Sequence, residues 1–135
     1  MTRVMIVENA EKPLWLAKKL LSAINYEIAF ETANGYEAIE KYEVVKPDLI
    51  LLDLKPSQNA GQNIIQEIKK KNSEARIIAL TRDSNAKIIE DSLNGGALQC
   101  ITIPFSMKDF VTLLSGVEKL PKVKSEERPL IIEES

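Results

Sequence analysis

The chain has 135 residues, 44% of them hydrophobic, and its 18 basic and 20 acidic side chains give a formal net charge of −2. This length suits a single domain with one core, and the near-neutral charge without a long basic run gives no reason to expect nucleic-acid binding. The absence of histidine excludes Ser/His/Asp and Cys/His catalysis, and the single cysteine, Cys100, excludes an internal disulfide and any multi-cysteine metal site.

Five short runs rich in Val, Ile and Leu predict β-strands. The first, third and fourth are apolar almost throughout, as expected of strands that are covered on both faces. The second is flanked by acids and suits the edge of a sheet. In chain order the runs are RVMIV at 3–7, EIAFE at 27–31, LILLD at 49–53, ARIIAL at 75–80 and LQCITI at 98–103.

Apolar residues at the spacing of α-helices follow each of these runs. Ser84 is predicted to cap the fourth helix and Asn94-Gly95-Gly96 to end it. Strict alternation of strand and helix predicts an α/β fold with a parallel sheet, helices on both faces and right-handed crossovers. The helical segments are 14–24, 38–42, 64–68, 88–93 and 110–117.

Polar residues stand at the predicted carboxyl ends of the strands, where parallel sheets bind their ligands. Asp53 closes the apolar run LILLD, Glu8 and Asn9 follow the first strand, and Thr81 follows the fourth. Burying a carboxylate costs several kcal/mol unless it is paired with a cation or remains accessible to solvent at the edge of the sheet. Asp53 is therefore expected to belong to a functional site or to have a local counter-ion.

The last segment, 120–135, holds two prolines, many charges of both signs and one short apolar run. We interpret it as a linker or flexible tail that follows a single domain at 1–119. No apolar run along the chain approaches membrane-spanning length, and we expect a cytoplasmic protein without direct membrane contact.

Five motifs in order, VMIVENA, ANGYEAIEKYEVVKPDLILLDL, IIALT, NGGA and ITIPF, resemble the receiver domain of two-component response regulators. The resemblance covers residues 3–119. It implies a flavodoxin-like, doubly wound sheet of order 2-1-3-4-5 with five helices. It also implies phosphorylation by a partner histidine kinase on an aspartate that corresponds to Asp53, and a switch hydroxyl that corresponds to Thr81.

The chain departs from the family pattern in the magnesium and phosphate positions. Receivers usually place two acids after the first strand to hold Mg²⁺, and here Glu8 and Asn9 stand there, to be joined by Asp53 and the backbone carbonyl of Lys55. A neutral amide in an oxygen-ligand site lowers its charge, so we expect a weak magnesium site. The lysine that the family places before the proline of the fifth strand is Ile103, which cannot donate to a phosphoryl oxygen.

Two cations occur where the family does not usually have them, Lys55 two residues after Asp53 and Arg82 directly after Thr81. We hypothesise that one of them pairs with Asp53 and replaces part of the missing positive charge; the alternative is that both point into water. The aromatic switch of the family falls near Cys100, which has no ring. The chain's other candidate aromatics, Trp15, Phe105 and Phe110, are interpreted as packing residues.

Three functions remain open. The first is a pseudo-receiver with a degenerate acidic pocket that signals through protein contacts, without enzymatic activity. The second is a weakened but phosphorylatable receiver that a histidine kinase switches. The third is a small flavodoxin-like enzyme or nucleotide binder, against which stands the absence of glycine in ENAEKP after the first strand. The expected partners are a histidine kinase or a downstream signalling protein, and a homodimer is compatible with the pattern.

Overall fold

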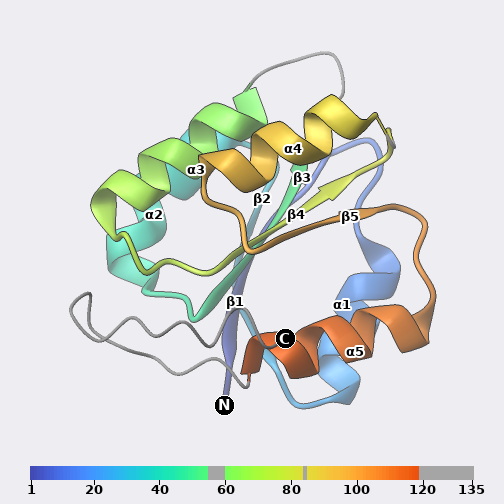
Figure 1. Cartoon of the computed structure of the whole chain (residues 1–135). Helices are drawn as coiled ribbons and strands as arrows, with labels where there is room; N and C mark the ends of the chain where they lie inside the picture. Colours follow the sequence, from blue (N-terminus) through green and yellow to red (C-terminus); the bar gives the residue numbers. More distant parts are fainter. Residues whose placement is uncertain (55–59, 84, 119–135) are drawn as a thin grey trace. The chain divides into compact units, whose positions relative to one another are not determined.

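The computed structural model describes residues 1–54, 60–83 and 85–118. Five parallel strands lie in the order β2-β1-β3-β4-β5, which confirms the predicted flavodoxin-like α/β fold (Figure 1). The elements are β1 (Arg3–Val7), α1 (Trp15–Ala23), β2 (Glu27–Thr32), α2 (Gly35–Val45), β3 (Leu49–Leu54), α3 (Ala60–Lys71), β4 (Ile77–Thr81), α4 (Ala86–Gly95), β5 (Gln99–Thr102) and α5 (Met107–Glu118).

The chain divides into two units. Residues 1–104 form the first, which contains the sheet and α1 to α4, and the second begins at Phe105 and contains α5. Within the second unit the rings of Phe105 and Phe110 stack with their centroids 4.8 Å apart. The predicted domain end at 119 and the predicted tail at 120–135 lie outside the described residues.

The central strands are buried as predicted. Every residue of β3 and β4 is buried, whereas the edge strand β2 keeps most of its residues partly or fully exposed. On one face of the sheet, residues of β1 and β3 join buried residues of α2 and α3 in one apolar core. Ile50, Leu52 and Leu54 belong to this core. Because side chains alternate along a strand, Asp53 belongs to the opposite face, on which α1 lies (Figure 1).

The strand register sets the position of the polar residues. Leu54 of β3 lies beside Thr81 of β4, and Asp53 lies beside Leu80. In the neighbouring pair, Val7 of β1 lies beside Leu52. The carboxyl ends of the three central strands therefore bring the segments that follow Val7, Asp53 and Thr81 to one edge of the sheet.

Helix ends follow local hydrogen-bonding chemistry. Asn34 caps α2 and accepts hydrogen bonds from the backbone N–H groups of Tyr36 and Glu37. Asn85 caps α4 through a 2.7 Å hydrogen bond from the N–H of Lys87, while the predicted cap, Ser84, lies outside the described residues. Gly96 follows α4 with φ of 121°, a backbone conformation that favours glycine, so the predicted stop of this helix is confirmed.

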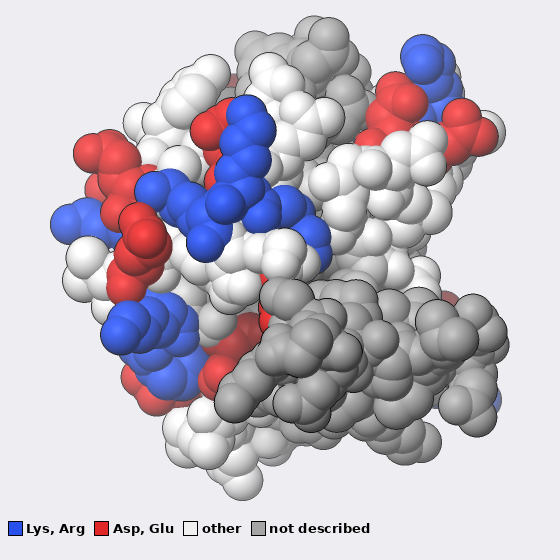
Figure 2. Space-filling view, turned by 60° about the vertical axis from the view of Figure 1, so that its left-hand side comes forward, with Lys and Arg blue, Asp and Glu red and all other residues white. Residues whose placement is uncertain are grey.

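The surface carries charges of both signs. Acidic and basic side chains are interspersed over the face displayed in Figure 2. Several of them form exposed pairs, such as Lys70 with Glu67 at 3.0 Å and Lys71 with Glu43 at 3.1 Å. In the part of the chain that the structure describes, no helix combines the length and apolar character needed to cross a membrane.

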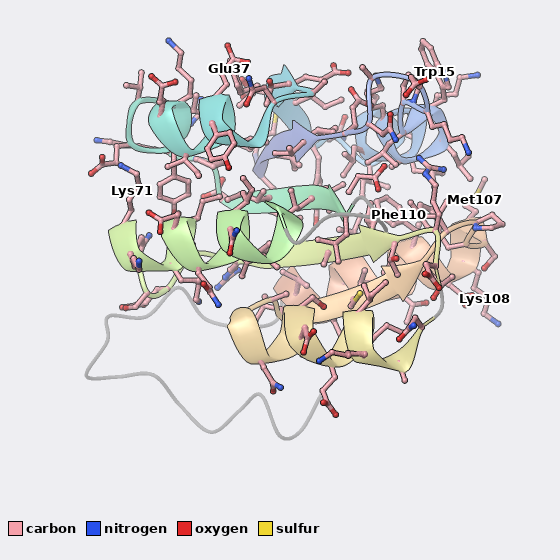
Figure 3. All side chains as sticks on the ribbon, turned by 90° about the horizontal axis from the view of Figure 1, so that it is seen from above. Trp15, Glu37, Lys71, Met107, Lys108 and Phe110 are labelled. Carbon is pink, nitrogen blue, oxygen red and sulfur yellow. The ribbon has the colours of Figure 1, made fainter. Side chains whose placement is uncertain are left out.

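Trp15 corrects one sequence-based interpretation. Its side chain does not pack in the core but is 66% exposed at the start of α1, and Figure 3 shows it pointing away from the sheet. The ammonium group of Lys18, one turn later, lies 4.8 Å from the ring centroid, a cation–π contact. Helical spacing placed Trp15 beside the apolar stripe of α1, but its neighbours Leu14 and Ala17 are the residues that are buried.

We expect Gly35→Ala to destabilise the fold. A Cβ at this position would lie 2.3 Å from Cδ1 of Ile64, and Ile64 is itself buried between α2 and α3. Overpacking of this kind costs about 1–3 kcal/mol of the free energy of unfolding, which urea denaturation would measure. Gly116→Ala is the matched control, since a Cβ there meets no described atom within 4 Å and alanine favours the helix. Equal effects of the two substitutions would contradict the prediction.

Candidate functional site at the carboxyl ends of the central strands

Asp53 is a buried carboxylate with a direct cationic partner. It is the second-last residue of β3, and only 2% of its side chain is exposed. Nη2 of Arg82 donates a hydrogen bond to Oδ2 of Asp53 at 3.0 Å. An ion pair at this distance combines charge attraction with a hydrogen bond, which is the strong form of both interactions. The pairing supplies the local counter-ion that an acid in this strand needs.

Arg82 also contacts a third segment of the chain. The same Nη2 donates to the backbone carbonyl of Lys12, in the segment between β1 and α1, at 2.8 Å. The side chain is 25% exposed, but its Nε is buried and has no hydrogen-bond partner among the described residues. One guanidinium nitrogen thus joins the end of β3, the end of β4 and the segment before α1.

Glu8 supports the start of α1. Its Oε1 accepts a 2.7 Å hydrogen bond from the backbone N–H of Leu14, the residue that precedes the helix. Its Oε2 lies 3.4 Å from Nζ of Lys18, which also pairs with Glu31 at the end of β2. A carboxylate in this place satisfies an N–H group that the helix leaves unpaired and interacts favourably with the helix dipole.

Burial and the neighbouring carboxyl set the acidity of Glu8. Desolvation raises the pKa of Glu8 above its ordinary value of 4.5, and a hydrogen bond with Glu31 raises it further. The same hydrogen bond, together with Lys18, lowers the pKa of Glu31. The pKa of Lys18 is raised, mainly by its hydrogen bond to Glu31. Glu8 and Glu31 therefore form a carboxyl pair in which Glu8 is the member that holds a proton more readily.

Asn9 makes a local turn. Its Oδ1 accepts a 2.9 Å hydrogen bond from the N–H of Glu11, and its backbone carbonyl accepts one from the N–H of Lys12 at 3.1 Å. These contacts shape the segment that presents the Lys12 carbonyl to Arg82. The side-chain oxygen that the sequence offered as a metal ligand is thus used within the turn.

The predicted magnesium ligands do not form an oxygen cage in this arrangement. The oxygens of Glu8 and Asn9 accept bonds from the chain's own N–H groups, a guanidinium lies on Asp53, and Lys55 lies outside the described residues. No group of three or more Asp, Glu, Cys or His side chains within the described ranges is placed to hold a metal. A divalent ion about 4 Å from a guanidinium would meet a repulsion of roughly 8 kcal/mol at an effective dielectric constant of about 20. The described donors of this set, in this arrangement, do not fit Mg²⁺.

Thr81 is buried, and its hydroxyl group is bonded to the loop that follows β4. Oγ1 donates to the backbone carbonyl of Asp83 at 3.0 Å and accepts from the N–H of the same residue at 3.1 Å. The Asp83 carboxylate in turn accepts from the N–H of Asn85 at 3.0 Å. The hydroxyl that would follow a phosphoryl group is therefore held by its own loop.

The two remaining family positions lie at β5. The N–H of Ile103 donates to the carbonyl of Thr81 at 2.7 Å, which extends the pairing of β4 with β5. Cys100 is partly buried, and desolvation raises the pKa of its thiol while a hydrogen bond with Ser92 opposes the shift. The thiol is thus kept in its neutral form, as in a small packing residue.

Comparison with known proteins identifies the family. The model of the response regulator receiver domain matches residues 4–115. The chain belongs to the response regulator receiver family. Among curated relatives it is 32% identical over 117 residues to the chemotaxis protein CheY of Thermotoga maritima, covering 87% of this chain and 98% of that protein. It is 33% identical over 109 residues to the transcriptional regulatory protein PdtaR of Mycobacterium tuberculosis, covering 81% of this chain and 53% of that protein.

Solved receiver structures share the fold. The CheX–CheY–BeF3–Mg²⁺ complex from Borrelia burgdorferi matches with a TM-score of 0.78 at 22% identity, over 91% of this chain and 90% of that one. A CheY-like receiver domain protein from Methanospirillum hungatei matches with a TM-score of 0.75 at 24% identity, over 88% and 95% of the two chains. At this level of identity the likeness concerns the fold alone. This receiver therefore has the family architecture.

Sequence reasoning missed three participants of the site. The carbonyl of Lys12 is a backbone group, so no property of the lysine side chain indicates its role. Lys18 and Glu31 come together only when α1 packs beside β2. A signal for Glu8 was available in its spacing, since it stands six residues before Leu14, whose N–H at the cap position of α1 is left without a partner in the helix.

We expect Asp53→Asn to lower the free energy of unfolding by about 1–3 kcal/mol, because it leaves the half-buried guanidinium of Arg82 without its anion. Urea denaturation would measure the loss. Asp91→Asn is the control: Asp91 pairs with the exposed Lys87 at 3.4 Å, and such surface pairs contribute within about 1 kcal/mol. If Asp53 instead faced other unpaired acids, removing its charge would relieve repulsion and raise the free energy of unfolding. A gain in stability of Asp53→Asn would therefore contradict the pairing with Arg82.

We expect Glu8→Gln to stabilise the protein increasingly as pH rises. A raised pKa in the fold means that the contribution of Glu8 is fully present below its unfolded value near 4.5 and is lost as pH climbs through the folded value. Glutamine keeps an acceptor for Leu14 and a donor for Glu31 without ionising. Melting temperatures from about pH 4 to about pH 7 should separate variant and parent progressively. Glu40→Gln, on the exposed side of α2, is the control, and a pH-independent difference at Glu8 would overturn the assignment.

Proposed function

We propose that this receiver acts as a protein-binding signalling module whose Asp53 stays paired with Arg82, and that phosphorylation of Asp53 is not its switch. The observation that carries the proposal is the buried ion pair between Nη2 of Arg82 and Oδ2 of Asp53, at 3.0 Å. In this role the protein acts in the cytoplasm and has no enzymatic activity.

The chemistry of phosphoryl transfer supports this reading. An attacking carboxylate oxygen must lie in line with the phosphorus atom, and cations must neutralise the three phosphoryl oxygens. The Asp53 side chain is almost fully buried and is paired with the guanidinium group of Arg82. Ile103 occupies the position at which the family has a cationic donor. The loss of one such donor costs about 2.7–4 kcal/mol in sites where it has been removed. Both the attacking carboxylate of Asp53 and the cationic groups that would assist phosphoryl transfer are therefore poorly arranged for this reaction.

The relay that follows phosphorylation is altered as well. The Thr81 hydroxyl is bonded to both backbone groups of Asp83, so it must break two hydrogen bonds before it can reach a phosphoryl group. Cys100 offers no ring to move between exposed and buried positions when Thr81 moves. Signalling through binding surfaces needs neither step, and this favours recognition by a protein partner.

A phosphorylatable receiver is the second candidate, and Arg82 itself is the feature that favours it. A guanidinium presents several donors in a fixed plane and binds phosphoryl oxygens well. In that case Arg82 would leave Asp53 for the transferred group and would act in place of Mg²⁺ and of the lysine that Ile103 replaces. The two candidates differ in whether a small phosphodonor modifies Asp53.

The proposed partner is a protein, either a histidine kinase or a downstream signalling protein, and a homodimer fits the same proposal. The Borrelia burgdorferi CheY was solved in complex with CheX, so a related fold does form a protein complex. Direct nucleic-acid binding is not proposed, because the net charge is −2 and charges of both signs are interspersed on the displayed face (Figure 2).

Incubation with acetyl phosphate, with and without Mg²⁺, followed by intact-mass spectrometry tests the proposal. We expect the mass to remain unchanged under both conditions, while a receiver known to be labelled gains one phosphoryl group in parallel. A gain of one phosphoryl group that Asp53→Asn abolishes would establish the phosphorylatable receiver instead. A gain that survives in Asp53→Asn would place the modification elsewhere and leave the proposal for Asp53 intact.

A further inference from the structure

The Nη2 atom of Arg82 lies between two oxygen atoms of different segments. Oδ2 of Asp53 is 3.0 Å from it and the backbone carbonyl oxygen of Lys12 is 2.8 Å from it. One oxygen is a carboxylate at the end of β3, and the other is a carbonyl in the turn that Asn9 shapes. Both accept from the same nitrogen, so both are directed to one point in space.

We infer that these two oxygens form a masked cation site, and that Arg82 occupies it and excludes divalent metal ions from the pocket. A carboxylate and a carbonyl are the oxygen donors that Mg²⁺ takes in proteins, where the ion usually keeps several waters and uses one or two carboxylates. The inference deepens the proposed function, because it rests on the same pairing of Asp53 with Arg82.

The charge balance of the pocket supports the exclusion. Among the described residues, Asp53 is paired with Arg82, and Glu8 is paired with Lys18, which it shares with Glu31. Affinity for a divalent ion rises with the number of uncompensated carboxylates around it. Arg82 compensates the charge of Asp53 and uses the two oxygens that would bind Mg²⁺, so an incoming ion would have to displace a bound cation.

The burial of the Arg82 Nε atom indicates that the protein holds this side chain in a fixed position. Its Nε is buried without a hydrogen-bond partner among the described residues, so the side chain leaves one donor unpaired to bring Nη2 between the two oxygens. A cation that merely lay on the surface would keep that donor in water. The guanidinium is thus held by its two acceptors and by the surrounding packing.

Removal of Arg82 should convert the pocket into a metal site. In Arg82→Ser the carboxylate of Asp53 loses its counter-ion, and the two oxygens remain in place on β3 and on the turn before α1. We expect Mg²⁺ alone, or Mn²⁺ alone, to bind this variant at least about tenfold more tightly than the parent chain, a difference of about 1.4 kcal/mol. Calorimetric titration at constant ionic strength measures both constants. The fluorescence of Trp15, the only tryptophan and three residues after Lys12, provides a second readout.

Three further variants make the test specific. Arg82→Lys keeps the charge and should bind Mg²⁺ no better than the parent. Arg82→Ser combined with Asp53→Asn removes the carboxylate and should lose the gained affinity. Lys87→Ser removes an exposed cation from α4 and should change nothing, which excludes a general effect of net charge. If Arg82→Ser does not fold, Arg82→Gln decides, because an uncharged amide of similar length removes the charge of Arg82 from the carboxylate.

Tight Mg²⁺ binding by the parent chain, or affinities of Arg82→Ser and Arg82→Gln equal to that of the parent, would overturn the inference. Neither result requires phosphorylation. Conversely, labelling of the parent chain at Asp53 by acetyl phosphate in the absence of metal would remove the proposed function and leave the masked site intact. The two ideas therefore fail in different measurements.

Discussion

A carboxylate at the end of a fully buried strand needs a compensating charge, and the arrangement of the carboxyl edge of this sheet depends on where that charge comes from. Here it comes from Arg82, whose single nitrogen joins Asp53 to the carbonyl of Lys12. The pair ties β3, β4 and the segment before α1 together. Removing one member of such a pair leaves a poorly solvated charge, so the pair constrains both residues even where its net contribution to stability is modest.

The same principle applies one strand away. Glu8 is buried at the end of β1, and its charge is compensated by Lys18 and by the N–H of Leu14. The family resemblance leads one to expect these two acids to face a shared metal ion. In this chain each acid instead has a cationic partner from the protein, Arg82 for Asp53 and Lys18, which Glu31 shares, for Glu8. Two separate sets of contacts therefore compensate the acids at this edge. The contacts of Glu8 support the start of α1, and the pair of Asp53 with Arg82 holds the residue that follows β4.

The sequence predicted the fold well because the signals of the fold are local and repeated. Alternating apolar strands and helices, with Asn34 and Gly96 at helix ends, leave few possible topologies. The site was only partly accessible for the opposite reason. Lys55 and Arg82 were both candidates for pairing with Asp53 in the sequence. The observed pair with Arg82 depends on side-chain reach between neighbouring strands, and Lys55 lies outside the described residues. The exposure of Trp15 was missed because helical spacing does not settle which residues at the edge of the apolar stripe are covered.

Glu8 couples the acidic edge of the sheet to the start of α1. Its side chain is long enough to bond the N–H of Leu14 at the start of α1. A shorter acid at this position would lie one methylene further from that N–H group and would lose the hydrogen bond. A single substitution that shortens Glu8 to suit a metal ion would therefore also remove a contact that supports the start of α1, so the electrostatics of the sheet edge and the placement of this helix cannot be changed independently.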